Sequence, residues 1–218
     1  MNIKTKNIEI IKNGLLTGMF LQLAIGPVFF FIINLVLQKT IFDGFAGVFA
    51  VTVVDYLYII LAIIGVGKLL EHKKFKTTFG IISSIVLIIF GLLIIKKVIT
   101  NDLTNNIIIN STNIFSSFFS VFLITISSPM TIIFFTSIFT TKAIEYNYTK
   151  KQLYIFAISV GLATFLFMST SVLISYFFKD VIPISIIQIL NMIIGLVLIG
   201  YGVLRILKNF RIEKLNLT

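Results

Sequence analysis

The sequence has no cysteine and no tryptophan, one histidine and only three prolines among its 218 residues. Without cysteine, the chain cannot form disulfides, thiolate metal sites or a dithiol relay, which excludes a thiol-disulfide electron carrier. Charge is scarce as well, because 12% of the residues are charged, against roughly 25% in ordinary soluble domains. A chain with so little charge is not expected to contain a soluble domain of any size.

Long uncharged segments take the place of a soluble domain. Hydrophobic residues make up 58% of the chain, and the mean hydropathy is +1.09. Four ranges lack Asp, Glu, Lys and Arg entirely: 13–38, 77–95, 152–178 and 181–204. Each has about the 17 to 25 residues that cross a bilayer, and the first is too long for a cleaved signal peptide. The sequence therefore predicts an all-α integral membrane protein in which residues 1–218 form a single transmembrane domain.

The basic residues predict how the chain is oriented in the membrane. Six transmembrane helices are expected, at about 14–37, 45–67, 79–95, 114–140, 153–178 and 183–204. Of the 18 Lys and Arg residues, 14 fall in the N-terminus, the second loop, the fourth loop and the C-terminal tail. By the positive-inside rule, this asymmetry places both termini in the cytoplasm. Topology thus explains the net charge of +10, so we expect a lipid bilayer and no nucleic acid as a partner.

A polar, Asn-rich linker at about 101–113 divides the chain into halves of three helices each, about 1–100 and 114–218. Pro27 in "FLQLAIGPVFFF" aligns with Pro129 in "FLITISSPMTII", and the Phe-Leu pair that begins each stretch aligns at the same offset. Because each half has an odd number of helices, the second half must enter the membrane upside down relative to the first. The pattern predicts an inverted repeat, as many secondary transporter folds have.

Each of these two prolines interrupts a predicted membrane helix. Proline has no N–H, so Pro27 leaves the carbonyl of Leu23 free, and Pro129 does the same for Thr125. In hydrocarbon, such groups are tolerated only where protein, water or a ligand satisfies them, and the helix N-terminus after each break can hold an anion such as a carboxylate. An ordinary kink explains a single proline, whereas the matched pair favours a substrate site. The predicted substrate-binding residues are Gln22, Leu23, Gly26, Pro27, Thr125, Ser128 and Pro129.

Small and polar residues in the first and last predicted helices fall on single faces. Gly14 and Gly18 have the small-xxx-small spacing of closely packed membrane helices, and Gln22 continues their face. Gln188 and Asn191 share one face of the last helix. These faces are predicted to point into the helix bundle, where packing between helices is a sufficient explanation for them.

Asp55, in "AVTVVDYLYII", is the one acidic residue near the middle of a predicted membrane helix. An ionised carboxylate there costs roughly 2.5 to 3.5 kcal/mol on insertion scales, and no Lys, Arg or His lies within a predicted span to neutralise it. The carboxyl must therefore be protonated, face a water-filled cavity or bind a cation. We expect a proton-coupling role for Asp55, with two alternatives: contact with a substrate ammonium, or a protonated carboxyl that is merely packed in the bundle.

The stretches "IGPVFFF", "VVDYL" and "SSPMTIIFF", in a chain with six short spans, resemble the LysE/RhtB family of amino-acid exporters. That family typically has Pro-Gly-Pro in its first helix and Asn-Pro-Lys in its fourth. Here Ile25 replaces the first proline, Ser128 the asparagine and Met130 the lysine, while the acidic position of the second helix is kept as Asp55. The resemblance implies a multi-pass protein of the bacterial cytoplasmic membrane that exports amino acids by using the proton gradient. The departures change what the site is able to hold.

Together these features predict a secondary transporter, an antiporter that exports amino acids or related small zwitterions by alternating access. No nucleotide-binding loop is present in the sequence, so direct use of ATP is not expected, and no cofactor is expected either. An exporter of metal cations or another small solute is an alternative, although a metal site usually needs more than one carboxylate, His or thiol. An enzyme would need a cluster of catalytic groups at one depth of the membrane, and Asp55 alone is too few, so we do not expect an enzyme. A noncatalytic membrane subunit is a further alternative, but it would not need paired helix breaks. A homo-oligomer is a possible assembly.

Overall fold

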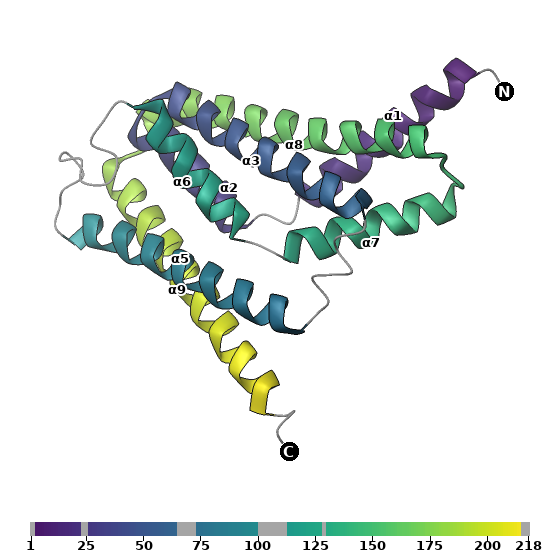
Figure 1. Ribbon diagram of the computed structural model, residues 1–218. Coiled ribbons are helices and arrows are strands. Elements are labelled where there is room, and N and C mark those ends of the chain that lie inside the picture. The colour runs from purple at the N-terminus through teal and green to yellow at the C-terminus, as the bar shows by residue number, and fades with distance from the viewer. Residues whose placement is uncertain (1–2, 23–25, 65–72, 100–112, 128–129, 215–218) are drawn as a thin grey trace.

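The computed structural model describes residues 3–22, 26–64, 73–99, 113–127 and 130–214, and its regular elements are all helical. Figure 1 shows the elements in chain order. They are α1 (Ile3–Gln22), α2 (Pro27–Gln38), α3 (Ile41–Ile64), α5 (Lys73–Ile99), α6 (Ile114–Ile126), α7 (Met130–Glu145), α8 (Lys150–Phe178), η1 (Lys179–Val181) and α9 (Ile184–Lys214).

Two of the predicted spans are each divided into two helices in the structure. The segment predicted at 14–37 consists of α1 and α2, whose axes differ in direction by 82°. Gly26 precedes α2 in an extended conformation, and Pro27 is the first residue of that helix, where its missing N–H has no partner to lose. The segment predicted at 114–140 consists of α6 and α7. Three predicted site residues, Leu23, Ser128 and Pro129, lie outside the described residues.

Side-chain caps explain where two helices of the second half begin. The Asn113 side chain accepts a hydrogen bond of 3.2 Å from the Phe115 N–H at the start of α6. Thr149 and Gln152 form a reciprocal capping box at the start of α8. Each cap satisfies N–H groups that have no partner within the helix. The two caps fix both helix starts within three residues of the boundaries that hydropathy predicts.

Glycines allow α1 and α8 to approach each other closely. A Cβ atom at Gly14 would lie 2.8 Å from the carbonyl oxygen of Phe156, and one at Gly18 would lie 2.7 Å from that of Val160. Such distances are too short for any side chain, so only glycine permits this packing. The prediction that Gly14 and Gly18 serve close helix packing is confirmed.

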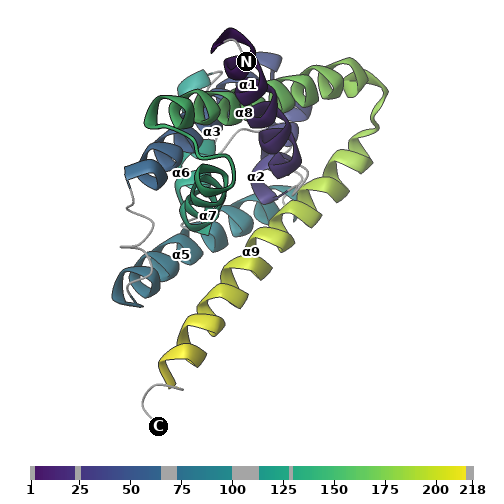
Figure 2. The same ribbon diagram turned by 90° about the vertical axis from the view of Figure 1, so that its right-hand side faces the viewer.

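The helices α5 and α9 form a second tightly packed pair, which lies on one side of the bundle in both Figure 1 and Figure 2. A Cβ atom at Gly91 would lie 2.6 Å from the carbonyl oxygen of Gly195, and a Cβ atom at Gly195 would lie 3.0 Å from the carbonyl oxygen of Gly91. The contact is therefore reciprocal, which is the form that a contact across a two-fold axis takes.

Three of the described helical segments are long and apolar enough to cross a membrane: Ile41–Ile64, Lys150–Val181 and Ser185–Leu204. The bent pair α1 and α2 adds a fourth if it counts as one span, and Ser84–Lys96 and Ile114–Ile126 are shorter apolar helices. The regular structure of the described residues is therefore all helical, with three or four candidate membrane-spanning segments. The six-span count and the cytoplasmic position of both termini stay predictions.

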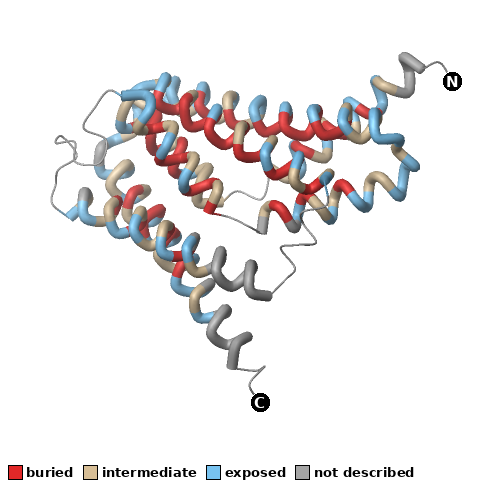
Figure 3. Tube along the Cα trace, in the orientation of Figure 1, coloured by how far each residue is buried: buried red, intermediate tan, exposed pale blue. Residues whose placement is uncertain are grey.

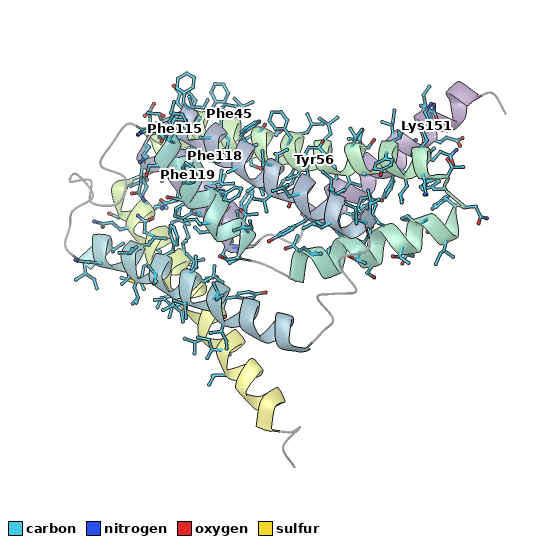
Figure 4. The ribbon with its side chains drawn as sticks, viewed as in Figure 1. Phe45, Tyr56, Phe115, Phe118, Phe119 and Lys151 are labelled. Atoms are coloured by element: carbon cyan, nitrogen blue, oxygen red, sulfur yellow. The ribbon has the colours of Figure 1, made fainter. Side chains whose placement is uncertain are left out.

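Burial distinguishes the inside of the bundle from an apolar outer surface. Buried residues lie along the facing sides of α2, α3, α6 and α8 (Figure 3). Large apolar side chains also project outward, among them Phe115 and Phe119 of α6 (Figure 4), which are 70% and 56% exposed. Apolar surface of this kind is rare on soluble proteins but is what lipid tails require of a membrane protein.

Candidate functional site

A cavity of about 700 Å³ lies at the two helix breaks. Gln22, Gly26 and Pro27 line it from the break between α1 and α2. Thr125 and Thr131 line it from the break between α6 and α7. Two breaks that are about a hundred residues apart in the sequence are thus part of one wall, and four of the seven predicted substrate-binding residues belong to it.

Asp55 of α3 also lines this cavity and is 6% exposed. The Thr164 hydroxyl donates a hydrogen bond of 2.9 Å to the Asp55 carboxyl oxygen Oδ2, and the Gln22 side-chain amide donates one of 2.7 Å to the Thr164 hydroxyl. A hydroxyl has one proton to donate and lone pairs that accept, so Thr164 serves both partners at once. The chain of hydrogen bonds connects the end of α1 to Asp55 through α8.

Sequence reasoning missed Thr164, because the predicted helix boundaries do not align it with Asp55. Asp55 and Thr164 lie at the same distance along the chain from the first residues of their helices, Ile41 in α3 and Lys150 in α8. Counted from the predicted starts at 45 and 153, however, Asp55 aligns with Ala163, so the match with Thr164 depends on the helix starts that the structure shows. The comparison that aligns the prolines uses a different offset and aligns Asp55 with Ala157 instead.

The end of α6 is satisfied by a tyrosine that sequence reasoning also missed. The Tyr58 hydroxyl, on α3, donates a hydrogen bond of 2.7 Å to the carbonyl oxygen of Ile126, the last residue of α6. A carbonyl at a helix end has no partner within the helix, and in a membrane bundle it needs another donor. The neighbouring Thr125 hydroxyl donates to the Val121 carbonyl within α6. The sequence predicts a free carbonyl at Thr125, but the Ser127 N–H donates to it, and the carbonyl at the helix end that Tyr58 satisfies belongs to Ile126.

Residues at the start of α2 line the cavity. Gly26, Pro27, Val28 and Phe29 all line it. The sequence predicts unpaired N–H groups over residues 28–30, but the Phe29 N–H already donates a bond of 3.1 Å to the Gly26 carbonyl. That amide already has a partner, so Phe29 is not one of the unpaired N–H groups that the sequence predicts.

Most of the cavity wall is apolar. Five lining residues have polar side chains: Gln22, Asp55, Thr125, Thr131 and Tyr201. The others are Leu21, Gly26, Pro27, Val28, Phe29, Val51, Leu87, Ile124, Phe134, Phe135, Met168 and Val197. Among the lining residues that the structure describes, Asp55 is the only carboxylic acid, and none is Lys, Arg or His. In the same part of the chain, no group of three or more His, Asp and Glu residues is placed to hold a metal ion.

A polar cluster joins α3 to α6 at the left end of the bundle in Figure 1. The Ser117 hydroxyl donates to Asp43 Oδ1 at 2.5 Å, and the Thr40 hydroxyl donates to Asp43 Oδ2 at 2.6 Å. The Lys39 ammonium nitrogen lies 3.6 Å from Asp43 Oδ1 and 3.3 Å from Ser117 Oγ. Asp43 is 2% exposed. The predicted span began at residue 45 and left Asp43 in a loop, although the pattern Thr40-x-x-Asp43 before an apolar run is a helix-start signal.

A second set of hydrogen bonds ties the same end of the bundle to α9. The Gln38 side-chain amide donates to Asn34 Oδ1 and, at 2.8 Å, to Asn191 Oδ1. The Lys179 ammonium donates to the Lys39 carbonyl oxygen at 2.5 Å. Asn191 is 2% exposed, so the prediction that it faces the bundle is confirmed. The ends of α2 and α8 and the starts of α3, α6 and α9 are thus held together.

The family comparison fits this architecture. The model of the LysE type translocator family matches residues 19–209, which include both helix breaks and Asp55. The chain belongs to the LysE type translocator family. It is therefore a multi-pass membrane protein of a transporter family, and the resemblance seen in the sequence is confirmed. No curated protein and no solved structure matches this LysE type translocator.

Proposed function

We propose that this LysE type translocator exports amino acids or related small zwitterions, and that the proton gradient drives the export. One observation carries the proposal: two broken helices and the buried carboxyl of Asp55 meet at one cavity. A zwitterion has one anionic and one cationic end, and the cavity offers helix N-termini for the first and a carboxylate for the second. Leu23, Ser128 and Pro129 remain proposed members of the site.

In this proposal, the substrate carboxylate lies at the N-termini of α2 and α7, where the helix dipoles favour negative charge. The carboxyl group of Asp55 takes up and releases the coupling proton as its access alternates between the two sides of the membrane. Thr164 orients the carboxyl through its hydrogen bond, and Gln22 connects this pair to the first helix break. A proton that enters as the substrate leaves makes the protein an antiporter.

Two contacts support the inverted repeat as the basis of alternating access. The reciprocal contact of Gly91 and Gly195 joins α5 and α9, the third helix of each half. The hydrogen bond between Asp55 and Thr164 joins equivalent positions of α3 and α8. Both contacts fit a two-fold axis in the membrane plane, and a transporter of this kind works by moving one group of helices against the other.

We propose that the structure is the inward-facing state. The polar cluster around Asp43 closes the end that is predicted to be external, and Phe31, Leu35 and Leu37 of α2 are buried between that end and the break. Phe134 and Tyr201, on other parts of the cavity wall, remain about half exposed. The cavity then opens toward the cytoplasm, from which an exporter must load its substrate.

The test is efflux from vesicles that contain only the purified protein and a mixed pool of amino acids. When an inwardly directed proton gradient is imposed, at least one amino acid should leave faster than from protein-free vesicles, and a protonophore should remove the acceleration. An efflux rate that the protonophore leaves unchanged would contradict coupling to the proton gradient. No efflux at all would contradict amino acids as the substrate. Efflux of a divalent metal ion from vesicles loaded with that ion would favour the alternative of a cation exporter.

A further inference from the structure

The charge content of the cavity limits the net charge of its substrate. The described wall has one carboxylic acid, Asp55, and no basic side chain. A substrate ammonium is matched by that one carboxylate, so a second positive charge on a substrate side chain would be desolvated without a partner. A negative side chain would place a second carboxylate close to Asp55, where like charges repel. The wall is therefore matched to a substrate whose side chain is neutral.

The remaining wall is suited to an apolar group. Leu87 comes from α5, Val197 from α9, Phe134 and Phe135 from α7, and Met168 from α8. These residues come from α7, from α8 and from the packed pair of α5 and α9, so an apolar side chain in the cavity would contact more than one helix. The transfer of such a group from water is favourable in proportion to its buried area. A cavity of about 700 Å³ has room for a large side chain.

From this combination we infer that the cavity selects amino acids with a bulky, uncharged, apolar side chain, the class of leucine, methionine and phenylalanine. The inference rests on the proposed function, because it assigns the side chain of a substrate whose charged ends the helix breaks and Asp55 bind. In this arrangement, the wall formed by α5, α7, α8 and α9 sets the specificity. A hydrophobic pocket gains about 10- to 200-fold per methylene group of substrate, so leucine exceeds alanine by at least about tenfold.

The first test measures kcat/KM for single amino acids in vesicles that contain the unaltered protein. Leucine, methionine and phenylalanine should each exceed serine, lysine and aspartate by about tenfold or more. Lysine, aspartate or serine transported as well as leucine would overturn the inference while leaving amino-acid export intact. If no amino acid moves at all, the proposed function fails, and the inference fails with it.

The second test makes the cavity smaller at its apolar wall with one substitution, and it includes a matched control on the same helix. Val197→Phe adds an aromatic ring to a residue that lines the cavity, whereas Val203→Phe adds the same ring to a similarly exposed residue of α9 that does not line it. Val197→Phe should lower phenylalanine efflux about tenfold or more and change valine efflux little. Val203→Phe should transport both as the unaltered protein does.

Two outcomes of the second test would contradict the assignment of this wall. Equal loss of valine and phenylalanine efflux in Val197→Phe would mean that residue 197 does not distinguish side chains by size. Unchanged efflux of both would mean that the substrate side chain does not contact α9. If Val197→Phe fails to fold, the first test decides the inference by itself, because it uses the unaltered protein.

Discussion

The Thr164 hydroxyl donates a hydrogen bond of 2.9 Å to the carboxyl of Asp55, and the two residues occupy the same position in α8 and α3 counted from the helix starts. The first half of the chain thus has the acid Asp55 at the position where the second half has Thr164, the residue that donates a hydrogen bond to it. The pairing gives the only acidic residue of the cavity wall, within the described residues, a fixed partner. It also makes the surroundings of Asp55 testable by changing Thr164 alone.

Thr164→Val removes the hydroxyl while keeping the shape of the side chain. We expect proton-driven efflux to fall about 10- to 100-fold, since a hydrogen bond to a charged group contributes roughly 1.5 to 3 kcal/mol. The pH dependence of efflux should also shift, because the donor favours one protonation state of the carboxyl. Thr164→Ser keeps the hydroxyl and should restore both the rate and the pH profile. Loss of rate in Thr164→Val with an unchanged pH profile would indicate a purely structural role.

Asp55→Asn keeps the shape and hydrogen-bonding capacity of the side chain but removes its ability to titrate. If Asp55 carries only the coupling proton, the variant should fold, bind substrate and exchange it across the membrane, but lose efflux driven by the proton gradient. If its carboxylate also pairs with the substrate ammonium, as proposed, binding itself should weaken by about 10- to 100-fold as well, because a charge-assisted hydrogen bond is lost. Binding, exchange and driven efflux are measured on the same preparation, and full activity in all three would contradict both roles.

Tyr58→Phe leaves the carbonyl of Ile126 without the donor that satisfies it at the end of α6. An unsatisfied buried carbonyl costs about 1 to 3 kcal/mol, and this bond is part-buried, so thermal unfolding in detergent should occur at a lower temperature. Tyr56→Phe is the matched control: the Tyr56 hydroxyl, also on α3, donates to the carbonyl of Ile158, but this carbonyl lies in the interior of α8 and the bond is at an exposed position. Equal melting temperatures for the two variants would show that the Tyr58 bond does not stabilise the break.

The absence of cysteine allows the closed end of the bundle to be tested with a single introduced thiol. Thr125→Cys places the thiol in the cavity wall, and a membrane-impermeant reagent added from outside should label it slowly. Adding Asp43→Asn should increase labelling from outside, because the contacts of this carboxylate with Lys39 and Ser117 hold α3 and α6 together.

Adding Glu145→Gln to the same reporter is the control, since it removes an exposed ion pair with Lys142 far from the cluster. This control should leave external labelling unchanged. Labelling from outside that is already fast with an intact Asp43 would mean that the Asp43 end is not the external gate.

Gly91→Ala should destabilise the pair of α5 and α9. The added Cβ atom would lie 2.6 Å from the Gly195 carbonyl oxygen, and overpacking of this kind costs about 1 to 3 kcal/mol. Gly200→Ala, on α9, is the control because no atom lies within 4 Å of its added Cβ, so its stability should stay equal or rise by up to about 1 kcal/mol. Thermal unfolding of both variants measures the difference, and equal stability would contradict the close contact of the two helices.

Local features of the sequence predicted the class of the protein and the position of most helices. Hydropathy over 20 or so residues is a local property, so the apolar segments around Asp55 and Asn191, Ile41–Ile64 and Ser185–Leu204, were predicted to within four residues, whereas the C-terminal extension of α9 to Lys214 was not. The break before α2 was also local, because the backbone of Pro27 cannot continue a helix through the preceding turn. The close packing of Gly14 and Gly18 followed from their spacing alone.

The polar start of α3 shows where local prediction was less accurate. Hydropathy placed the boundary after Asp43, because a charged residue is normally assigned to the water-exposed side. In the structure Asp43 is inside the helix and buried, since Lys39, Thr40 and Ser117 together satisfy its carboxylate. One of those three partners comes from another helix, so no window around Asp43 contains the reason for its burial.

By itself, then, the sequence determined that the chain is a helical membrane protein, that its first and fourth predicted spans are broken and that one acid lies among apolar residues. Only the tertiary structure decided that Thr164 and Gln22 serve Asp55, that Tyr58 satisfies the end of α6, and that both breaks line one cavity. Hydropathy and backbone chemistry depend on residues that are near neighbours in the chain, so a short stretch of sequence is enough to predict their effects. The partners of Asp55 and Ile126 come from distant segments, and only the packing of whole helices brings them within hydrogen-bonding distance.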